Sequence, residues 1–177
     1  AVRRLFTEAL PFEDHGRVAR QGLVTADDFR FVRLSFEAPT SAIRTGRWRP
    51  FAKGGAYAPY YADLNLLVSW GVAQRGLEAF GEIKGNAARS RQCSEHYFRP
   101  GLTWPLRTDG LSFRVFPAGC IFSHKGPAAF VGSDDHEGLL GLLAVANSRA
   151  FGCLVSLQLA RTELAQSYEV GLIQRTP

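Results

Sequence analysis

The chain has 177 residues, of which 46% are hydrophobic and 21% charged, a composition that fits one ordinary globular domain and excludes a largely disordered segment. The net charge is +5, with 18 arginines against 3 lysines. A GC-rich genome or recognition of phosphates and guanine edges would each explain this excess, so charge allows a nucleic-acid partner without establishing one. Methionine is absent even from position 1, so we expect a segment of a longer protein.

Cysteine spacing and apolar runs indicate the compartment. Cys93, Cys120 and Cys153 are odd in number, are widely spaced and form no CxxC pair, which predicts a reduced, cytoplasmic protein without structural zinc. The longest apolar stretch, 139–160, is interrupted by Asn-Ser-Arg at 147–149. A charge in the middle of a membrane span is unfavourable, so this stretch predicts a buried helical hairpin and no membrane partner.

The first half of the chain predicts strands and loops. Residues 1–22 are polar and basic, and we interpret them as a connector from an upstream region to one domain at 23–177. Alternation over 28–36 predicts a strand, whereas the glycines and prolines of 38–59 predict a loop-dominated segment. The apolar run 64–70 predicts a second strand.

The middle of the chain predicts a helix, a loop and three strands. Apolar residues at helical spacing favour a helix over 73–84, followed by a basic loop at 85–91. We predict strands at 111–116 and 120–124, joined by a turn, and a further short strand at 128–131.

The last third predicts two helices. Ser133 is a candidate N-cap, with Asp134, Asp135 and Glu137 favourably placed at the positive end of the helix dipole. A second helix is expected from about Ser148. Together the elements predict an α+β fold, with a mixed, mostly antiparallel sheet and a C-terminal helical pair.

Several segments occur in an order and spacing that resemble one family. They are GLVTADDFRF (22–31), WRPFAKGG (48–55), YY (60–61), VSW (68–70), EIK (82–84), YFRPGLTW (97–104), SFR (112–114), PAGCIFS (117–123), KG (125–126), LGLL (140–143) and NSRAF (147–151). As an ordered set, this pattern resembles the target-recognition region of BREX phage-defence methyltransferases and of related type IIG restriction-modification enzymes. That region is akin to the specificity domain of Taq-type adenine methyltransferases.

The resemblance implies a DNA reader that lacks catalytic machinery. In that family an upstream domain binds S-adenosylmethionine and flips the target adenine out of the duplex, using an Asn-Pro-Pro-Tyr or Asp-Pro-Pro-Tyr motif. This chain has no Pro-Pro pair and no glycine-rich turn suited to that cofactor. We therefore expect no cofactor in this fragment, an adenine-N6 methyltransferase as the parent protein, and double-stranded DNA as partner. The upstream methyltransferase domain and other proteins of a defence complex are further expected partners.

Two groups of candidate DNA contacts lie in predicted loops. At Lys53, Gly54 and Gly55 the glycines let the backbone approach a phosphate that the lysine neutralises, and Tyr57 follows; a tight turn beside a solvated lysine is the alternative. In the second group, Arg89 and Arg91 lie two apart in the basic loop and can follow phosphates, although an ordinary solvated loop explains them almost as well. Lys125 follows the end of a predicted strand, from which it can reach the DNA backbone.

The segment 101–114 is the preferred recognition element. Thr103, Arg107, Ser112 and Arg114 supply donors for phosphates or base edges, and Trp104 offers a ring that can stack or support the loop. Packing of Trp104 in the core is the favoured alternative.

Two other function classes stay open. Asp63, Glu82 and Lys84 formally match the Asp…Glu-x-Lys pattern of a metal-dependent nuclease, although that chemistry needs Glu82 and Lys84 on a strand and the sequence predicts them at the end of a helix. The acidic run at 134–137 is better explained as a helix cap than as a metal site. A protein-docking module, using an apolar face of 139–160, is the third class.

Overall fold

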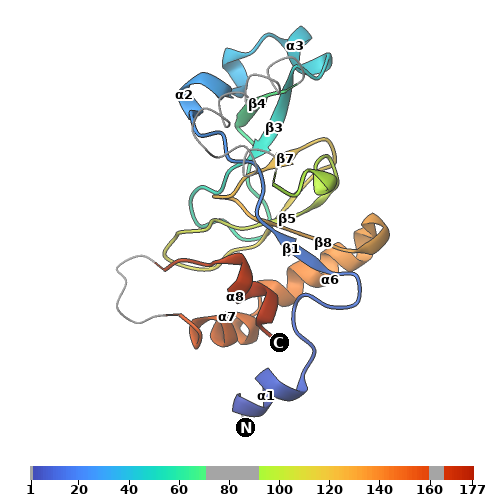
Figure 1. Ribbon diagram of the computed structural model, residues 1–177, viewed down its shortest axis with the longest axis vertical. Coiled ribbons are helices and arrows are strands. Elements are labelled where there is room, and N and C mark those ends of the chain that lie inside the picture. The colour runs from blue at the N-terminus through green and yellow to red at the C-terminus, as the bar shows by residue number, and fades with distance from the viewer. Residues whose placement is uncertain (1, 71–91, 160–165) are drawn as a thin grey trace.

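Two small sheets and a group of C-terminal helices follow one another along the molecule (Figure 1). The computed structural model describes residues 2–70, 92–159 and 166–177. The elements, with η marking 3-10 helices, are α1 (Val2–Glu8), β1 (Val18–Arg20), α2 (Asp28–Phe31), β2 (Val32–Leu34), η1 (Ser35–Glu37), α3 (Thr40–Arg44), β3 (Trp48–Ala52), β4 (Leu66–Ser69), η2 (Ser94–His96), β5 (Gly101–Thr103), β6 (Arg114–Phe116), β7 (Ile121–Phe122), β8 (Ala128–Phe130), η3 (Gly132–Asp134), α6 (His136–Ala146), α7 (Arg149–Ser156) and α8 (Val170–Arg175).

One sheet lies toward the end of the molecule opposite α1 and is called the distal sheet (Figure 1). Its strand order is β2-β4-β3-β7. Its first three strands pair antiparallel, and β3 pairs with β7 in parallel, with Phe51 opposite Ile121. Leu23, Val68 and Phe122 are buried in the cluster that covers this sheet. The parallel β3–β7 pairing matters for function because it brings the two chain segments that leave these strands to the same end of the sheet.

The central sheet has the strand order β1-β8-β5-β6, and all its pairings are antiparallel. Residues of this sheet are buried in one hydrophobic cluster with residues of α6, α7 and α8. Trp104 lies fully buried in this cluster, with its ring 4.9 Å from that of Phe113 between centroids, and its Nε1 donates a 2.9 Å hydrogen bond to the Tyr168 carbonyl. The aromatic core therefore fixes the helices against the sheet.

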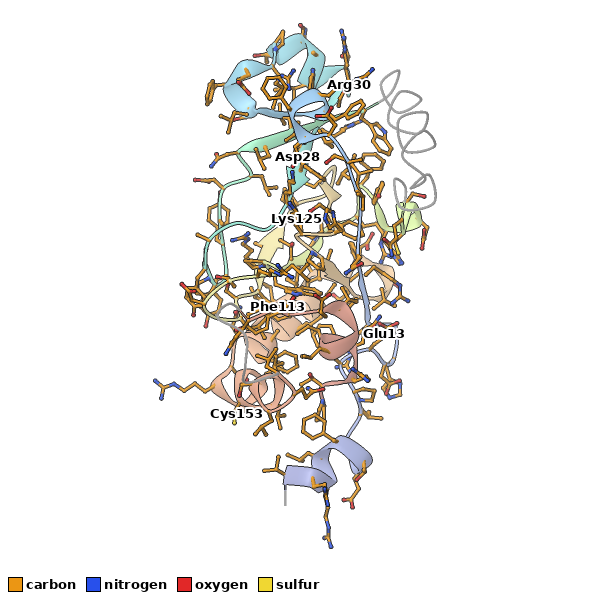
Figure 2. The ribbon with its side chains drawn as sticks, turned by 60° about the vertical axis from the view of Figure 1, so that its left-hand side comes forward. Glu13, Asp28, Arg30, Phe113, Lys125 and Cys153 are labelled. Atoms are coloured by element: carbon orange, nitrogen blue, oxygen red, sulfur yellow. The ribbon has the colours of Figure 1, made fainter. Side chains whose placement is uncertain are left out.

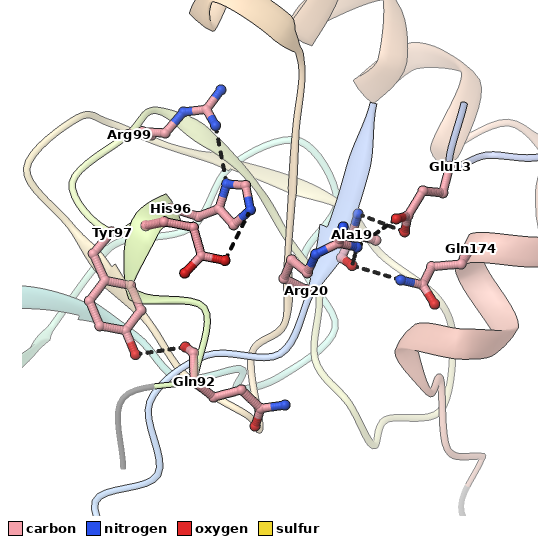
Figure 3. Close-up of polar contacts among 9 residues, drawn as sticks. Glu13, Ala19, Arg20, Gln92, His96, Tyr97, Arg99 and Gln174 are labelled. Carbon is pink, nitrogen blue, oxygen red and sulfur yellow. Dashed lines mark hydrogen bonds and ion pairs between the residues drawn. The ribbon is translucent and has the colours of Figure 1, made fainter. Parts of the chain in front are cut away.

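The N-terminal segment takes part in this core. Phe12 is buried, and its amide donates a 2.7 Å hydrogen bond to the Thr176 carbonyl. Figure 3 shows Ala19 accepting from Gln174 at 2.9 Å and Arg20 paired with Glu13 at 2.6 Å. The division into a connector at 1–22 and a domain at 23–177 stays a prediction, although β1 is a strand of the central sheet.

The predicted α+β class, with mostly antiparallel sheets and C-terminal helices, is confirmed. The strands expected at 64–70 and 128–131 are present as β4 and β8, and α7 begins directly after Ser148, whose side chain accepts from the Phe151 amide. The helix expected at 73–84 and the basic loop at 85–91 lie outside the described residues.

Two local predictions were wrong. The strand expected over 28–36 is the helical turn α2, then the short strand β2 and η1, because Asp27 caps α2 by accepting from the Arg30 amide. The segment 38–59 is loop-dominated, as expected, although it also contains α3 and β3. Asp135, and not Ser133, caps α6, accepting from the amides of Glu137 and Gly138.

The two strands expected at 111–116 and 120–124 exist as β6 and β7, but they form no hairpin. β6 pairs with β5 in the central sheet, whereas β7 pairs with β3 in the distal sheet. The turn between them therefore connects the two sheets.

Among the described helices, none is by itself long and apolar enough to cross a membrane. α6 and α7 reach that length and composition only as a pair, which is bent by 61°. Leu139, Leu142 and Phe151 of this pair are buried against the central sheet.

Candidate nucleic-acid interface

A basic pocket of about 370 Å³ lies where the chain segments after β3, β5 and β7 meet. Its cationic and titratable side chains are Lys53, Arg107, His124 and Lys125, and Pro105 adds apolar surface. Figure 2 shows Lys125 between the two sheets in the middle of the molecule. Three of the predicted contact groups, at 53–55, 107 and 125, are thus brought together by the fold.

Two glycines allow the loops that form this pocket to cross in backbone contact. Gly54 has a φ of +83°, and a Cβ there would lie 2.5 Å from the Lys125 carbonyl oxygen. A Cβ on Gly126 would lie 2.4 Å from the Gly54 nitrogen. Ser123 fixes the second loop, since its Oγ accepts from the amides of Lys125 at 3.1 Å and Gly126 at 3.0 Å. Any larger side chain at positions 54 or 126 would therefore separate the loops.

Arg114 supports the loop at 53–56 from the protein interior. Its guanidinium donates to the carbonyl oxygens of Gly54 and, at 3.1 Å, Ala56. The residue is only 6% exposed, and burial lowers its pKa. Because its donors are directed at the loop backbone, Arg114 positions the loop from the interior rather than reaching outward to a ligand.

An acidic side chain sits behind Lys53. Lys53 forms an ion pair with Asp28, which also accepts from the Thr25 hydroxyl. Burial opposes ionisation of Asp28, but hydrogen bonds from Lys53 and Thr25 outweigh it and hold its pKa below the usual value. Arg107 and Lys125 are exposed, so an anion entering the pocket meets their charges first.

His124 adds a titratable group to the pocket. Burial is the main cause that lowers the pKa of His124, and the nearby charges of Lys125 and Lys53 lower it further. The ring lies 3.5 Å from the Leu23 carbonyl oxygen through Nδ1. The imidazole is therefore neutral at neutral pH, and a bound phosphate would favour its protonation.

Besides Arg114, three other predicted contacts face inward. Thr103 donates to the Pro127 carbonyl at 2.8 Å, Trp104 lies in the core, and Ser112 accepts from the Ala58 amide at 3.2 Å. All three are at most 1% exposed, so they support the loops and present no surface to a duplex. Tyr57 is 56% exposed and lies over Gly110.

The remaining candidates divide between described and undescribed residues. Arg89, Arg91, Glu82 and Lys84 lie outside the described residues. Asp63, the first residue of the nuclease pattern, is exposed and accepts a 2.8 Å hydrogen bond from the Tyr61 hydroxyl. Within residues 2–70, 92–159 and 166–177, no three His, Cys, Asp or Glu side chains are grouped as metal ligands would be.

Asp28 and His124 are site residues that sequence reasoning did not select. For Asp28 the signal was present, because Thr25, Asp27 and Asp28 are the residue types that begin a helix, and a helical turn directs Asp28 toward Lys53. The alternating pattern that follows suggested a strand instead.

These features define an α+β domain whose glycine-shaped basic pocket suits an anion. The chain is similar to the adenine-specific methyltransferase PglX of Lacticaseibacillus casei (strain Zhang), with 28% identity over 151 residues. The match covers 78% of this chain and 12% of that protein, so the chain spans about one eighth of its length. No protein-family model matches the chain. The similarity relates the chain to a domain associated with an adenine-specific methyltransferase.

Proposed function

We propose that this chain is the DNA target-recognition domain of an adenine-specific methyltransferase and that the basic pocket holds phosphates of the duplex. The observation that carries the proposal is the meeting of Lys53, Arg107, His124 and Lys125 on three loops, two of which Gly54 and Gly126 bring into backbone contact. Phosphate contacts of this kind fix the register of a protein on DNA, while neighbouring side chains read the base edges. The likeness to a segment of PglX supports the methyltransferase context.

Within this proposal the chain binds DNA without modifying it. Methyl transfer belongs to a separate domain that binds S-adenosylmethionine, and the complete enzyme marks a site for restriction-modification or for phage defence of the BREX type. Arg107 is the exposed residue of the segment 101–114 that we assign to base reading or to a phosphate at the mouth of the pocket.

The outer face of α6 supports docking to the rest of such an enzyme. α6 buries Leu139, Leu142 and Leu143 on one side, yet Leu140 is 59% and Val145 58% exposed on the other. A helix that is apolar all round normally has both faces covered. We assign this outer face to contact with the methyltransferase domain.

The test is binding of the 177-residue chain to a randomised DNA duplex library at two salt concentrations, with sequencing of the retained DNA. We expect enrichment of one short motif and an affinity that falls steeply as salt rises, because bound cations release counterions from the phosphates. No retention at low salt would contradict the proposal.

Single substitutions separate phosphate contacts from base readers. Lys125→Ala should weaken binding to all sequences and reduce the salt slope by about 1, whereas Arg107→Ala should cost about 1–3 kcal/mol and relax the motif at one position if it reads guanine. Arg149→Ala, an exposed arginine on α7, removes the same charge away from the pocket and is the matched control. An equal effect of all three variants would mean that DNA binding depends on net charge alone and not on the pocket.

A further inference from the structure

Two phenylalanines stand out on the tip of the distal sheet. Phe29 is 92% exposed and Phe36 is 81% exposed, whereas every other phenylalanine that the structure describes is at most 37% exposed. Both belong to the tip formed by residues 27–49, which lies at the end of the molecule opposite α1 (Figure 1). Figure 2 shows Arg30, the neighbour of Phe29, at this outer end. Apolar rings so fully in water mark a surface that contacts something else.

The backbone around both rings is held in place. Asp27 caps α2 by accepting from the Arg30 amide at 3.1 Å, and Arg33 donates to the Phe29 carbonyl at 2.5 Å. Glu37 accepts from the Leu34 amide at 2.7 Å, which closes the turn that carries Phe36. The rings are therefore presented by fixed turns, so a partner need not order them.

The outward position of Phe29 follows from the helical turn. In a strand, residues 29 and 31 would share one face, but in a helix they point in nearly opposite directions. Phe31 is 3% exposed and takes the inward position. Phe29 therefore faces solvent as a direct result of the cap at Asp27.

The tip has a positive charge around these rings. Between residues 27 and 49 there are five arginines against three carboxylates, a net charge of +2. Asp27 and Glu37 accept backbone hydrogen bonds and Asp28 pairs with Lys53, so each acidic group already has a partner within the protein. The arginines at 44 and 47 are exposed.

From this geometry we infer that Phe29 and Phe36 contact the faces of DNA bases while the exposed Arg44 and Arg47 hold the adjoining phosphates. A nucleic acid offers both flat apolar faces and regularly spaced anions, which is the combination this surface fits. The inference rests on the proposed function and adds a second contact to it, separate from the basic pocket. The rings either wedge between base pairs of a duplex or stack on unpaired bases.

The experiment compares the 177-residue chain with a Phe29→Ala/Phe36→Ala double variant. The probes are a DNA duplex and its single strand, each carrying 2-aminopurine, a base whose fluorescence rises when it is unstacked. We expect the double variant to bind about tenfold more weakly, because each base–ring stack contributes to affinity. Its salt slope should equal that of the unsubstituted chain, since no charge is removed.

Controls separate this inference from the proposed function. Leu10→Ala truncates a 59% exposed apolar side chain at the other end of the molecule and should leave DNA binding unchanged, and circular dichroism checks that each variant folds. A fluorescence rise on the duplex assigns the rings to a wedge, and quenching confined to the single strand assigns them to unpaired bases. Unchanged affinity of the double variant, with weaker binding by Lys125→Ala, would overturn the inference and leave the proposed function standing.

Two further outcomes would also overturn it. If the unsubstituted chain binds neither probe at low salt, the proposed function and the tip contact fail together. If the double variant keeps its DNA affinity but loses self-association in sedimentation, the tip is instead an interface with a second copy.

Discussion

At the residue scale, the basic pocket depends on two positions where no side chain fits. Gly54 and Gly126 meet backbone to backbone, and an added Cβ at position 126 would lie 2.4 Å from a nitrogen and 2.9 Å from a carbonyl carbon. Main-chain atoms on both sides cannot rotate away as a long side chain can, so the loops themselves would have to move.

We predict that Gly126→Ala lowers the free energy of unfolding by about 1–3 kcal/mol, as overpacking does in well-packed regions. It should also weaken DNA binding, because Lys125 moves with the displaced loop. Urea denaturation gives the first quantity and a titration with duplex DNA the second. Gly141→Ala is the matched control, since a Cβ there meets nothing within 4 Å in a helix, and it should stabilise by up to about 1 kcal/mol.

His124 should make stability and DNA affinity respond to pH in opposite directions. Its pKa lies below the usual 6.5 because of burial and then the nearby lysines, so the folded protein resists a proton that the unfolded chain accepts. Stability is therefore complete above pH 6.5 and falls as the pH drops toward the lower folded pKa. A phosphate in the pocket favours the charged ring, so affinity should rise over the same range.

The measurement is the ratio of DNA affinities at neutral pH and at about pH 6, for the unsubstituted chain and for His124→Asn. The variant should lose the increase at low pH. His96, whose pKa is also lowered by burial, is not among the residues that line the pocket, so His96→Asn should keep the increase. An unchanged ratio in His124→Asn would remove this histidine from phosphate binding.

At the scale of elements, side-chain caps determine where helices such as α2 and α6 begin, which the hydrophobic pattern did not predict. Asp135 accepts from the amides of Glu137 and Gly138 at the start of α6. We predict that Asp135→Ala lowers the free energy of unfolding by about 1 kcal/mol, measured by thermal or urea denaturation. Asp135→Asn keeps the acceptor and should cost much less; an equal loss would assign the effect to charge at the helix dipole.

The strands that were predicted correctly, such as β4 and β8, lie in largely apolar runs that no glycine or proline interrupts. The segment 28–36 failed because alternation of Phe and Arg satisfies a strand pattern while Asp27 supplies a helix cap. The segments β6 and β7 were found, but their separate partners β5 and β3 are distant in sequence. Local patterns carry no information about which sheet a strand joins.

At the scale of the whole molecule, the N-terminal segment divides into a part inside the fold and a part outside it. α1 buries none of its residues, whereas Phe12 lies in the core and β1 pairs with β8 in three register positions. We predict that deletion of residues 1–10 changes the free energy of unfolding by about 0.5 kcal/mol or less. Deletion of residues 1–20 should abolish cooperative unfolding, as monitored by circular dichroism.

These two deletions also test the boundary expected at residue 22. Cooperative unfolding after removal of residues 1–20 would support a connector up to that point, whereas its loss would place the boundary near residue 10. The polar, basic composition of this segment suggested a connector. The strand β1 within it was not predicted because its three residues are too few to form a strand pattern.

Several residues of the candidate site could be predicted from the sequence, but the pocket in which they meet could not. Lys53 and Lys125 each stand beside a glycine in the printed sequence, and Arg107 lies near them only after folding. What brings the loops together is the parallel pairing of β3 with β7 and the buried Arg114 beneath Gly54. Thr103, Trp104 and Ser112 are buried against segments that are distant from them in sequence, which no local pattern encodes.

The hydrogen bond between the Phe12 amide and the Thr176 carbonyl, 2.7 Å long, has a consequence for the way this domain can be carried. The segments around Phe12 and Thr176 lie side by side, and a domain whose two ends are close together can be inserted into a single surface loop of a host protein. Under the proposed function such a unit would be a cassette: exchange of one contiguous stretch of gene would transfer its sequence specificity to another host enzyme without remodelling the catalytic domain.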